Sequence, residues 1–428
     1  MNEIGNKIYN LAKELFPINR SITGNGVRET LNILKKELPA LDIYEIPTGT
    51  KCFDWDIPKE WNIKDAFITT PDGDKICKLS DSNLHVVNYS IPVNKTISLK
   101  ELQKHLHSLP DMPNAIPYIT SYYNETWGFC ITQKERDKLE EGDYKVIIDS
   151  TLEYGSLTYG ELLIKGESKE EIFLSTYVCH PSMANNELSG PVVTTYLAKW
   201  INSLNNRKYS YRIVFIPETI GSIAYISKHL DIMKKNIMAG FIVTCVGDDI
   251  SYSFLPSKYG DTYTDKVALF ALESYQPNFK KYSFLHRGSD ERQYCSVGVD
   301  LPICSVMRTK YWEYPEYHTS LDNLDFISPQ GLYGGYDILK KILTIIETNN
   351  IYKSSTICEV HLGKRGLYDC GKHASINNKN EIRNILNFLA YADGKNDLIE
   401  ISKYIQEDYF MMLPLVELLL EKKLLVRV

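Results

Sequence analysis

The sequence lacks long hydrophobic runs, secretory features and paired cysteines. None of its 428 residues belongs to an uncharged apolar stretch of about 18 residues, so no membrane span is expected. The first 16 residues show the apolar spacing of an amphipathic helix rather than the continuous apolar core of a secretory signal. The nine cysteines are scattered and form no CxxC pair, which excludes a zinc ribbon or a thioredoxin-type motif. Unpaired thiols of this kind suit a cytoplasmic protein.

Blocks of like charge are also missing. The formal net charge of -6 comes from interspersed acids and bases, which provide no electrostatic footprint for a phosphate backbone or an anionic lipid surface. Nucleic acid and membrane partners are therefore not expected. With 43% hydrophobic and 24% charged residues, the chain is globular in composition and long enough for two or three domains.

The pattern of apolar residues changes twice along the chain. Residues 1–46 and 156–352 alternate between strand-like and helix-like patterns, whereas residues 47–155 consist of short apolar runs broken by Pro, Gly, Asp and Asn. We therefore predict an α/β domain that carries a β-rich inserted domain at 47–155. A third domain is expected at 353–428.

Four strand patterns of the α/β domain are each followed by a helix pattern. Alternation of this kind predicts a mostly parallel, mixed sheet flanked by helices on both faces. The expected strands are 171–178, 211–216, 240–246 and 299–306, and the expected helices are 190–203, 220–233, 265–274 and 329–347.

The last segment has helical patterns at 381–392, 397–405 and 409–421, a turn at 393–396, and a short strand pattern at 424–428. Three helices and a strand resemble a winged-helix module, although a helical dimerisation unit would show the same pattern. Residues 381–428 lack a clustered basic recognition helix, which favours a protein partner over DNA. A homo-oligomer is compatible with this pattern.

Chemically capable side chains follow the ends of the predicted strands. His180 follows the first of the four strands, Glu218 follows the second, and His318 lies in a late loop. Open α/β sheets place their sites beyond the carboxyl ends of their strands, so these side chains are expected to converge. Two imidazoles and a carboxylate suit Zn²⁺ in a tetrahedral site with one open position. Glu218 would then act as the base for a water molecule.

Several segments resemble, in order along the chain, the landmarks of the co-catalytic zinc aminopeptidases. Within this clan the chain is most similar to bacterial aminopeptidase-like proteins linked with polysaccharide biosynthesis, which join the peptidase domain to a small insert and a C-terminal winged helix. The resemblance implies a zinc-aminopeptidase-like fold and a hydrolase of peptide or glycan-linked amides. The matching segments are the loop 20–26 and residues 159–190, 217–222, 288–291 and 317–322.

The resemblance assigns metal-binding roles to His180 and His318, but other positions depart from the family pattern. The acid that orients the first histidine is replaced by Ser182, and the metal-bridging aspartate by Asn186, with Glu187 next to it as a possible substitute. A neutral amide cannot offset the mutual repulsion of two divalent cations.

Two further acidic positions of the family pattern are altered. The double glutamate is reduced to Glu218, and a strand-end aspartate is replaced by Thr244, with Asp248 as the nearest acid. We therefore expect at most one tightly bound zinc.

Asp290 matches an acidic landmark of the family, so Asp290, Glu291 and Arg292 are candidates for contacts with a peptide or amino-sugar substrate. Glu187 or Asp290 could hold the free amino group of that substrate. A lone histidine after a strand is more often structural, and three readings therefore stay open: an amide hydrolase, a degenerate peptidase fold that binds or scaffolds, and a DNA-binding regulator built on the winged helix.

Overall fold

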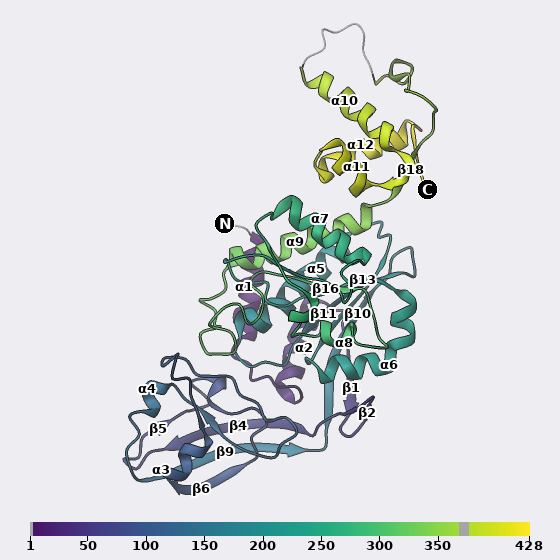
Figure 1. Cartoon of the computed structure of the whole chain (residues 1–428). Helices are drawn as coiled ribbons and strands as arrows, with labels where there is room; N and C mark the ends of the chain where they lie inside the picture. Colours follow the sequence, from purple (N-terminus) through teal and green to yellow (C-terminus); the bar gives the residue numbers. More distant parts are fainter. Residues whose placement is uncertain (1–2, 368–375) are drawn as a thin grey trace. The chain divides into compact units, whose positions relative to one another are not determined.

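The computed structural model describes residues 3–367 and 376–428, and the chain divides into two compact units, Met1–Lys341 and Ile342–Val428 (Figure 1). The first unit contains the α/β core together with the inserted domain. None of the helices in the described ranges is long and apolar enough to cross a membrane.

The core is an eight-stranded mixed sheet. Strands β12, β11, β13 and β16 run parallel at its centre, whereas β1 and β10 are antiparallel at one edge and β14 is antiparallel to β16 near the other. This confirms the predicted mostly parallel mixed sheet. The strand order is β1 (Asp42–Pro47), β10 (Ser156–Ile164), β12 (Ser210–Ile216), β11 (Glu171–Tyr177), β13 (Ile237–Ile242), β16 (Ile303–Met307), β14 (Ser253–Leu255) and β15 (Lys280–Lys281).

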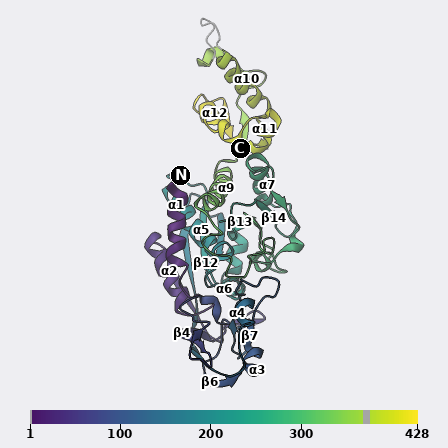
Figure 2. The ribbon, with the colours of Figure 1, turned by 90° about the vertical axis from the view of Figure 1, so that its left-hand side faces the viewer.

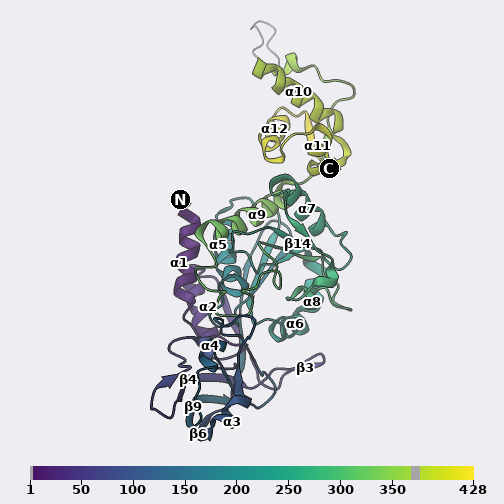
Figure 3. The ribbon, with the colours of Figure 1, turned by 60° about the vertical axis from the view of Figure 1, so that its left-hand side comes forward.

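Helices cover both faces of this sheet (Figures 2 and 3). Every residue of β11 and β12 is buried, as expected for parallel strands between two helical layers. On one face lie α1 (Glu3–Leu15), α2 (Asn25–Glu37) and α5 (Ser189–Ser203), and on the other lie α6 (Ile220–Asn236) and α8 (Glu291–Tyr294). The remaining helices of the core are α7 (Tyr263–Tyr275) and α9 (Pro329–Thr348).

The start of α5 packs directly against the carboxyl ends of two strands. A Cβ atom on Gly190 would lie 2.3 Å from the Thr176 hydroxyl and 2.3 Å from the Val243 carbonyl oxygen. Only glycine fits at such a distance, and the close approach brings the loop before α5 over the sheet edge where the site forms.

The inserted elements build a separate four-stranded antiparallel sheet with its own hydrophobic cluster, which includes Phe129, Val146 and Ile148. The sheet order is β5 (Lys75–Ile76), β4 (Glu60–Thr69), β9 (Asp143–Glu153) and β6 (Val93–Ser98). Shorter elements are β2 (Lys51–Cys52), β3 (Trp55–Asp56), α3 (Leu99–Leu102), β7 (Leu106–His107), β8 (Phe129–Cys130) and α4 (Gln133–Arg136).

A salt bridge fixes the base of the insert. Arg28 of α2 forms two hydrogen bonds of 2.7 Å with the carboxylate of Glu60 in β4, and the Ser156 backbone N–H donates to the same carboxylate at 2.9 Å. Because Ser156 begins β10, one carboxylate joins the entry and the exit of the insert.

The second unit has winged-helix architecture. A three-stranded antiparallel sheet of β18 (Asp393–Asp397), β17 (Ile351–Ser354) and β19 (Leu425–Arg427) combines with α10 (Ile376–Tyr391), α11 (Leu398–Ile405) and α12 (Tyr409–Glu421). The turn predicted at 393–396 is wrong, because this segment pairs with β17 as a strand. A capping box formed by Asp397 and Glu400 starts α11 directly after it.

Candidate metal site

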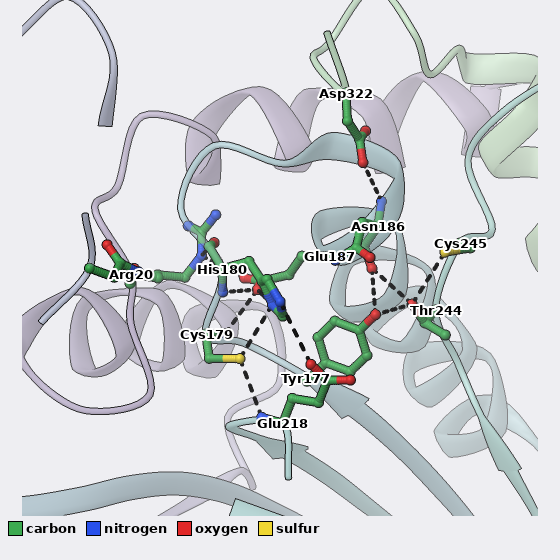
Figure 4. Close-up of polar contacts among 11 residues, drawn as sticks. Arg20, Tyr177, Cys179, His180, Asn186, Glu187, Glu218, Thr244, Cys245 and Asp322 are labelled. Carbon is green, nitrogen blue, oxygen red and sulfur yellow. Dashed lines mark hydrogen bonds and ion pairs between the residues drawn. The ribbon is translucent and has the colours of Figure 1, made fainter. Parts of the chain in front are cut away.

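His180, Glu218 and His318 come together at the carboxyl edge of the central strands. His180 follows β11, Glu218 follows β12, and His318 lies in the loop before α9. Nε2 of His180 lies 3.6 Å from a carboxylate oxygen of Glu218 (Figure 4), and the two imidazole centroids are 5.4 Å apart. The predicted convergence is therefore present in the fold.

The other nitrogen of His180 is held by Glu187. Nδ1 lies 3.0 Å from the Glu187 carboxylate, which also accepts hydrogen bonds from the backbone N–H groups of Cys179 and His180 (Figure 4). A carboxylate on Nδ1 fixes the tautomer that leaves Nε2 free to bind a metal. Glu187 thus supplies the orienting acid that the sequence pattern lacks at Ser182, and its predicted role as a substitute for the bridging aspartate stays a prediction.

The direction of Glu187 follows from a π-helical turn at Ala184–Leu188, which adds one residue to the start of α5. Arg20 closes the arrangement, because its Nε donates to Glu187 at 2.7 Å and both side chains are fully buried. The Arg20 guanidinium also donates to the carbonyls of His180 and Leu15, at 3.1 and 2.7 Å.

Asn186 is held by its backbone and has an unpartnered side chain. Its N–H donates to Asp322 at 2.9 Å, and its carbonyl accepts from Tyr177 at 2.9 Å and from Thr244 at 2.8 Å. Within the described residues, the buried amide oxygen and nitrogen of its side chain have no hydrogen-bond partner. Buried polar atoms are rarely left without a partner, so the Asn186 side chain is suited to a ligand.

The carboxylate of Asp248, which is predicted as a metal ligand, is occupied by hydrogen bonds from neighbouring protein groups. Its carboxylate accepts hydrogen bonds from the Thr309 N–H at 2.9 Å, the Thr309 hydroxyl at 2.6 Å, the Ile250 N–H at 2.9 Å and the Asn185 amide at 3.1 Å. These bonds use the acid as a structural junction. Thr244 is likewise occupied, since its hydroxyl bonds to Asn186 and Tyr177.

The three candidate substrate contacts lie beside Glu218 but differ in availability. Asp290 accepts from the Thr219 N–H at 2.8 Å and from the Ser222 hydroxyl at 2.9 Å, while its second oxygen is buried without a partner in the described part of the chain. Arg292 donates to the Thr219 hydroxyl at 2.8 Å. One oxygen of Glu291 accepts from Gly288, Ser289 and Tyr311, and its second oxygen, like that of Asp290, is buried without a partner in the described residues.

The electrostatics separate the two histidines. Burial, and then the neighbouring His180, lower the pKa of His318 to about 3, so His318 is neutral and able to bind a metal at physiological pH. Burial also lowers the pKa of His180, but the hydrogen bond and charge of Glu187 and the charge of Glu218 outweigh it and leave that pKa raised.

Two acids beside the histidines are shifted upward. Burial raises the pKa of Glu218, although His180 and Arg292 oppose the shift. Burial and the charge of Glu218 raise the pKa of Asp290 to about 7. Such shifted carboxyl groups are suited to proton transfer near neutral pH.

The donor types present at this edge of the sheet suit a zinc ion. Nε2 of His318 and the Asn186 amide oxygen are buried and unpartnered in the described residues, and Nε2 of His180 has the Glu218 carboxylate beside it at 3.6 Å. Among the His, Cys, Asp and Glu side chains of the described residues, Cys179, His180 and Glu187 form the group whose ligand atoms lie within 4.8 Å of one another. Within this group the Glu187 carboxylate is paired with Arg20 and holds Nδ1 of His180.

Three contributors were not predicted as site residues. Asp322 fixes the backbone of Asn185 and Asn186, at 2.6 and 2.9 Å, although its only sequence signal is its position four residues after His318. Tyr177 supports the same turn. Tyr118, from the insert, contacts both histidines, and no signal in the sequence connects it to them.

Comparison with known proteins identifies the family of the chain. Residues 9–349 match the family described as "Domain of unknown function (DUF4910)", and residues 350–427 match the winged helix-turn-helix family. A Clostridium acetobutylicum protein named "Putative polysaccharide biosynthesis protein with aminopeptidase-like domain" is 47% identical over 402 residues, which cover 94% of this chain and 92% of that protein.

Solved structures extend the comparison. A crystal structure titled "putative peptidase" from Clostridium acetobutylicum is 44% identical, with a TM-score of 0.93 over 100% of this chain and 97% of that one. A zinc aminopeptidase from Bacillus subtilis shares the fold, with a TM-score of 0.58 over 80% of this chain and 95% of that one at 12% identity. The chain belongs to the DUF4910 family, with a zinc-aminopeptidase-like fold and a C-terminal winged helix.

Proposed function

We propose that this protein is a zinc-dependent hydrolase that cleaves an amide bond in a small, amine-bearing peptide or amino-sugar substrate, with one tightly bound zinc. The observation that carries the proposal is the convergence of His180, Glu218 and His318, with the Nε2 atom of His318 and the Asn186 amide left without protein partners in the described residues. The name of the Clostridium relative supports an amide in a polysaccharide precursor as one class of substrate.

His180, His318 and the Asn186 amide oxygen would hold the metal. When bound, zinc polarises a substrate carbonyl and lowers the pKa of water. Three neutral protein ligands leave the charge of the ion available for that task and leave one coordination position open.

Glu218 would act as the proton carrier. Its carboxylate takes a proton from the attacking water and returns it to the leaving amine, a role that its raised pKa favours. The unpartnered oxygen of Asp290 would receive the ammonium group of the substrate, and Arg292 would fix the loop on which that contact depends.

The direct experiment combines metal analysis with turnover. Purified protein grown with zinc should contain one zinc per chain and hydrolyse aminoacyl p-nitroanilides or N-acylated amino sugars. Glu218→Gln should keep the zinc and lower kcat by about 10²–10⁴-fold. Glu273→Gln, an exposed acid on α7, is the matched control and should change neither.

A second candidate function is ligand binding without turnover. Asn186 and Thr244 favour it, because both stand where the resemblance requires acids and because the Thr244 hydroxyl is engaged by Asn186 and Tyr177. Protein without zinc or amidase activity that nevertheless binds amino sugars in calorimetry would support this binding or scaffold function and refute the hydrolase.

A further inference from the structure

The inserted domain reaches the metal site through residues 116–122, which we name the strap. The Tyr118 N–H donates to the carbonyl of His318 at 2.9 Å, and the Ser320 N–H donates to the carbonyl of Ile116 at 2.9 Å. Pro117 and Thr319 form an antiparallel bridge between these two bonds. One isolated β-bridge and two backbone hydrogen bonds thus join the strap to the loop that carries His318.

The other edge of the strap is fixed as well. The Asn88 N–H donates to the carbonyl of Ile119 at 2.9 Å, and the Ser121 N–H donates to the carbonyl of Asn88 at 3.0 Å. The side chain of Asn88 extends toward the core and donates to the Arg20 carbonyl at 3.5 Å. Backbone bonds on both edges make the strap a rigid element of the site.

The strap places one aromatic ring against both imidazoles. The Tyr118 ring centroid lies 5.2 Å from that of His318, edge-on at 89°, and 5.2 Å from that of His180 at 54°. His318 is also stacked on Tyr317, with the ring centroids 3.9 Å apart. The His318 ring therefore contacts two tyrosine rings.

The ring contacts of Tyr118 and Tyr317 with His318 take the place of the hydrogen bond that usually orients a metal-binding imidazole. A ligating histidine normally donates its second N–H to a carboxylate or a carbonyl, as His180 does to Glu187. In the described part of the chain no side-chain hydrogen bond orients the His318 ring, and its backbone has a positive φ of 56°. Ring contacts must then supply the orientation.

We propose that Tyr118 is a positioning residue of the metal site, supplied by the inserted domain, which sets the ring planes of His318 and His180 so that both face one cation. The inference rests on the metal-binding part of the proposed function. It gives the insert a role in the site itself, because the ring depends on a strap that only the insert can supply.

The first experiment measures metal binding to full-length protein. Zn²⁺ affinity is measured by competition with a chromophoric chelator, and coordination geometry from the visible spectrum of bound Co²⁺. Tyr118→Phe keeps the ring and should bind zinc within about twofold of wild type. Tyr118→Leu, with Tyr118→Met as a second variant in case the first misfolds, should lose about 10–100-fold and change the Co²⁺ spectrum.

Tyr123→Leu, which alters an exposed ring one residue beyond the strap, is the matched control and should behave as wild type. Unchanged zinc affinity and an unchanged Co²⁺ spectrum in folded Tyr118→Leu or Tyr118→Met would overturn the proposal. So would equal losses in Tyr118→Phe and Tyr118→Leu, because the hydroxyl rather than the ring would then be responsible.

A second experiment needs no metal and so separates this inference from the proposed function. Diethyl pyrocarbonate labelling of metal-free protein, read by mass spectrometry, should modify His318 slowly in wild type and several-fold faster in Tyr118→Leu, with exposed His286 as the internal reference. Faster labelling in a protein that binds no zinc would refute the hydrolase and the metal-positioning role together, and would leave Tyr118 as a ring that packs over His318. Unchanged labelling of His318 would refute the positioning role even if zinc binds.

Discussion

The carboxylate of Glu187 lies between Nδ1 of His180, at 3.0 Å, and Nε of Arg20, at 2.7 Å. One buried acid therefore orients the imidazole and is itself neutralised by a buried guanidinium. The family resemblance places an orienting acid two residues after the histidine, where this chain has Ser182. Here the same task is performed from the first turn before α5.

The Glu187 contact predicts two separable effects of Glu187→Gln. The amide cannot accept as strong a hydrogen bond from Nδ1, so zinc affinity should fall by about 10–100-fold in a chelator competition assay. Arg20 loses its charge partner inside the protein, so the free energy of unfolding in urea should fall by about 3–5 kcal/mol.

The double variant Arg20→Met with Glu187→Met serves as the control for the second effect. It removes both charges, so it should recover much of the lost stability while zinc affinity stays low. If Glu187→Gln bound zinc as tightly as wild type, the orienting role of Glu187 would be ruled out.

The unpartnered Asn186 side chain leads us to expect that an acidic substitution at this position increases the affinity for zinc. Asn186→Asp places a carboxylate where the amide has no protein partner, so zinc affinity should increase about tenfold or more, because an anionic ligand attracts the cation more strongly. Isothermal titration with Zn²⁺ measures the change.

The neighbouring Asn185 provides the comparison for that variant. The Asn185 side-chain oxygen accepts from the Gly247 and Asp248 N–H groups, and its amide donates to the Asp248 carboxylate. Asn185→Asp should therefore destabilise the fold, by opposing two buried carboxylates, without tightening zinc binding. Equal zinc affinity in wild type and Asn186→Asp would show that this side chain does not face the metal.

The Arg28–Glu60 pair predicts a pH-dependent stability. The hydrogen bond from Arg28 lowers the pKa of Glu60 from 4.5 to about 2. The pair therefore contributes fully above pH 4.5, and its contribution is lost as the pH falls toward 2. Because the Glu60 side chain is 13% exposed, solvent screens the pair and about 1–3 kcal/mol is expected.

Urea unfolding of wild type and Glu60→Gln tests this pair. The stability difference should be largest at pH 7 and should shrink between pH 4 and pH 2. Glu125→Gln, which removes an exposed ion pair with Lys59, should differ little from wild type at any pH. A Glu60→Gln deficit that stays constant down to pH 2.5 would contradict the assignment.

The C-terminal unit is predicted not to bind duplex DNA. Its third helix, α12, carries no lysine or arginine between Tyr409 and Glu421, so it cannot neutralise phosphates in the manner of a recognition helix. Met411 on this helix is 74% exposed, which suits a protein partner better. Fluorescence polarisation with random duplex DNA at 50 mM salt should show no binding in the micromolar range, and salt-dependent binding would refute the prediction.

The fold was largely predictable because its signals are local. Apolar spacing located the helices at 190–203 and 409–421, and the buried apolar runs located β11 and β12. Strand ends were less accurate. The run predicted as a strand to residue 246 leaves the sheet after Ile242, because residues 243–246 bend over the edge toward Ser189 and Asn186.

The candidate site was predictable only in part. His180, Glu218 and His318 follow strands or family landmarks, and their convergence needed no more than the rule that sites form at the carboxyl edge of the sheet. The direction of the Glu187 side chain depends on a π-helical turn, and that of Asp248 depends on its hydrogen bond with Thr309. Neither feature can be recognised from the spacing of residues in the sequence. Tyr118 is about 60–200 residues from its partners in the sequence, so only the folded chain reveals its contact.

Because of the strap, the inserted domain cannot be removed from this chain without changing the surroundings of His318. In many enzymes an inserted domain can be excised to leave a smaller catalyst, because it joins its host only at the two crossover points. Here the excision would also strip a β-bridge and an aromatic wall from the histidine loop. The α/β core and the insert are therefore expected to be kept together in related chains. A homologue that lost the insert but kept this site would need another ring in place of Tyr118.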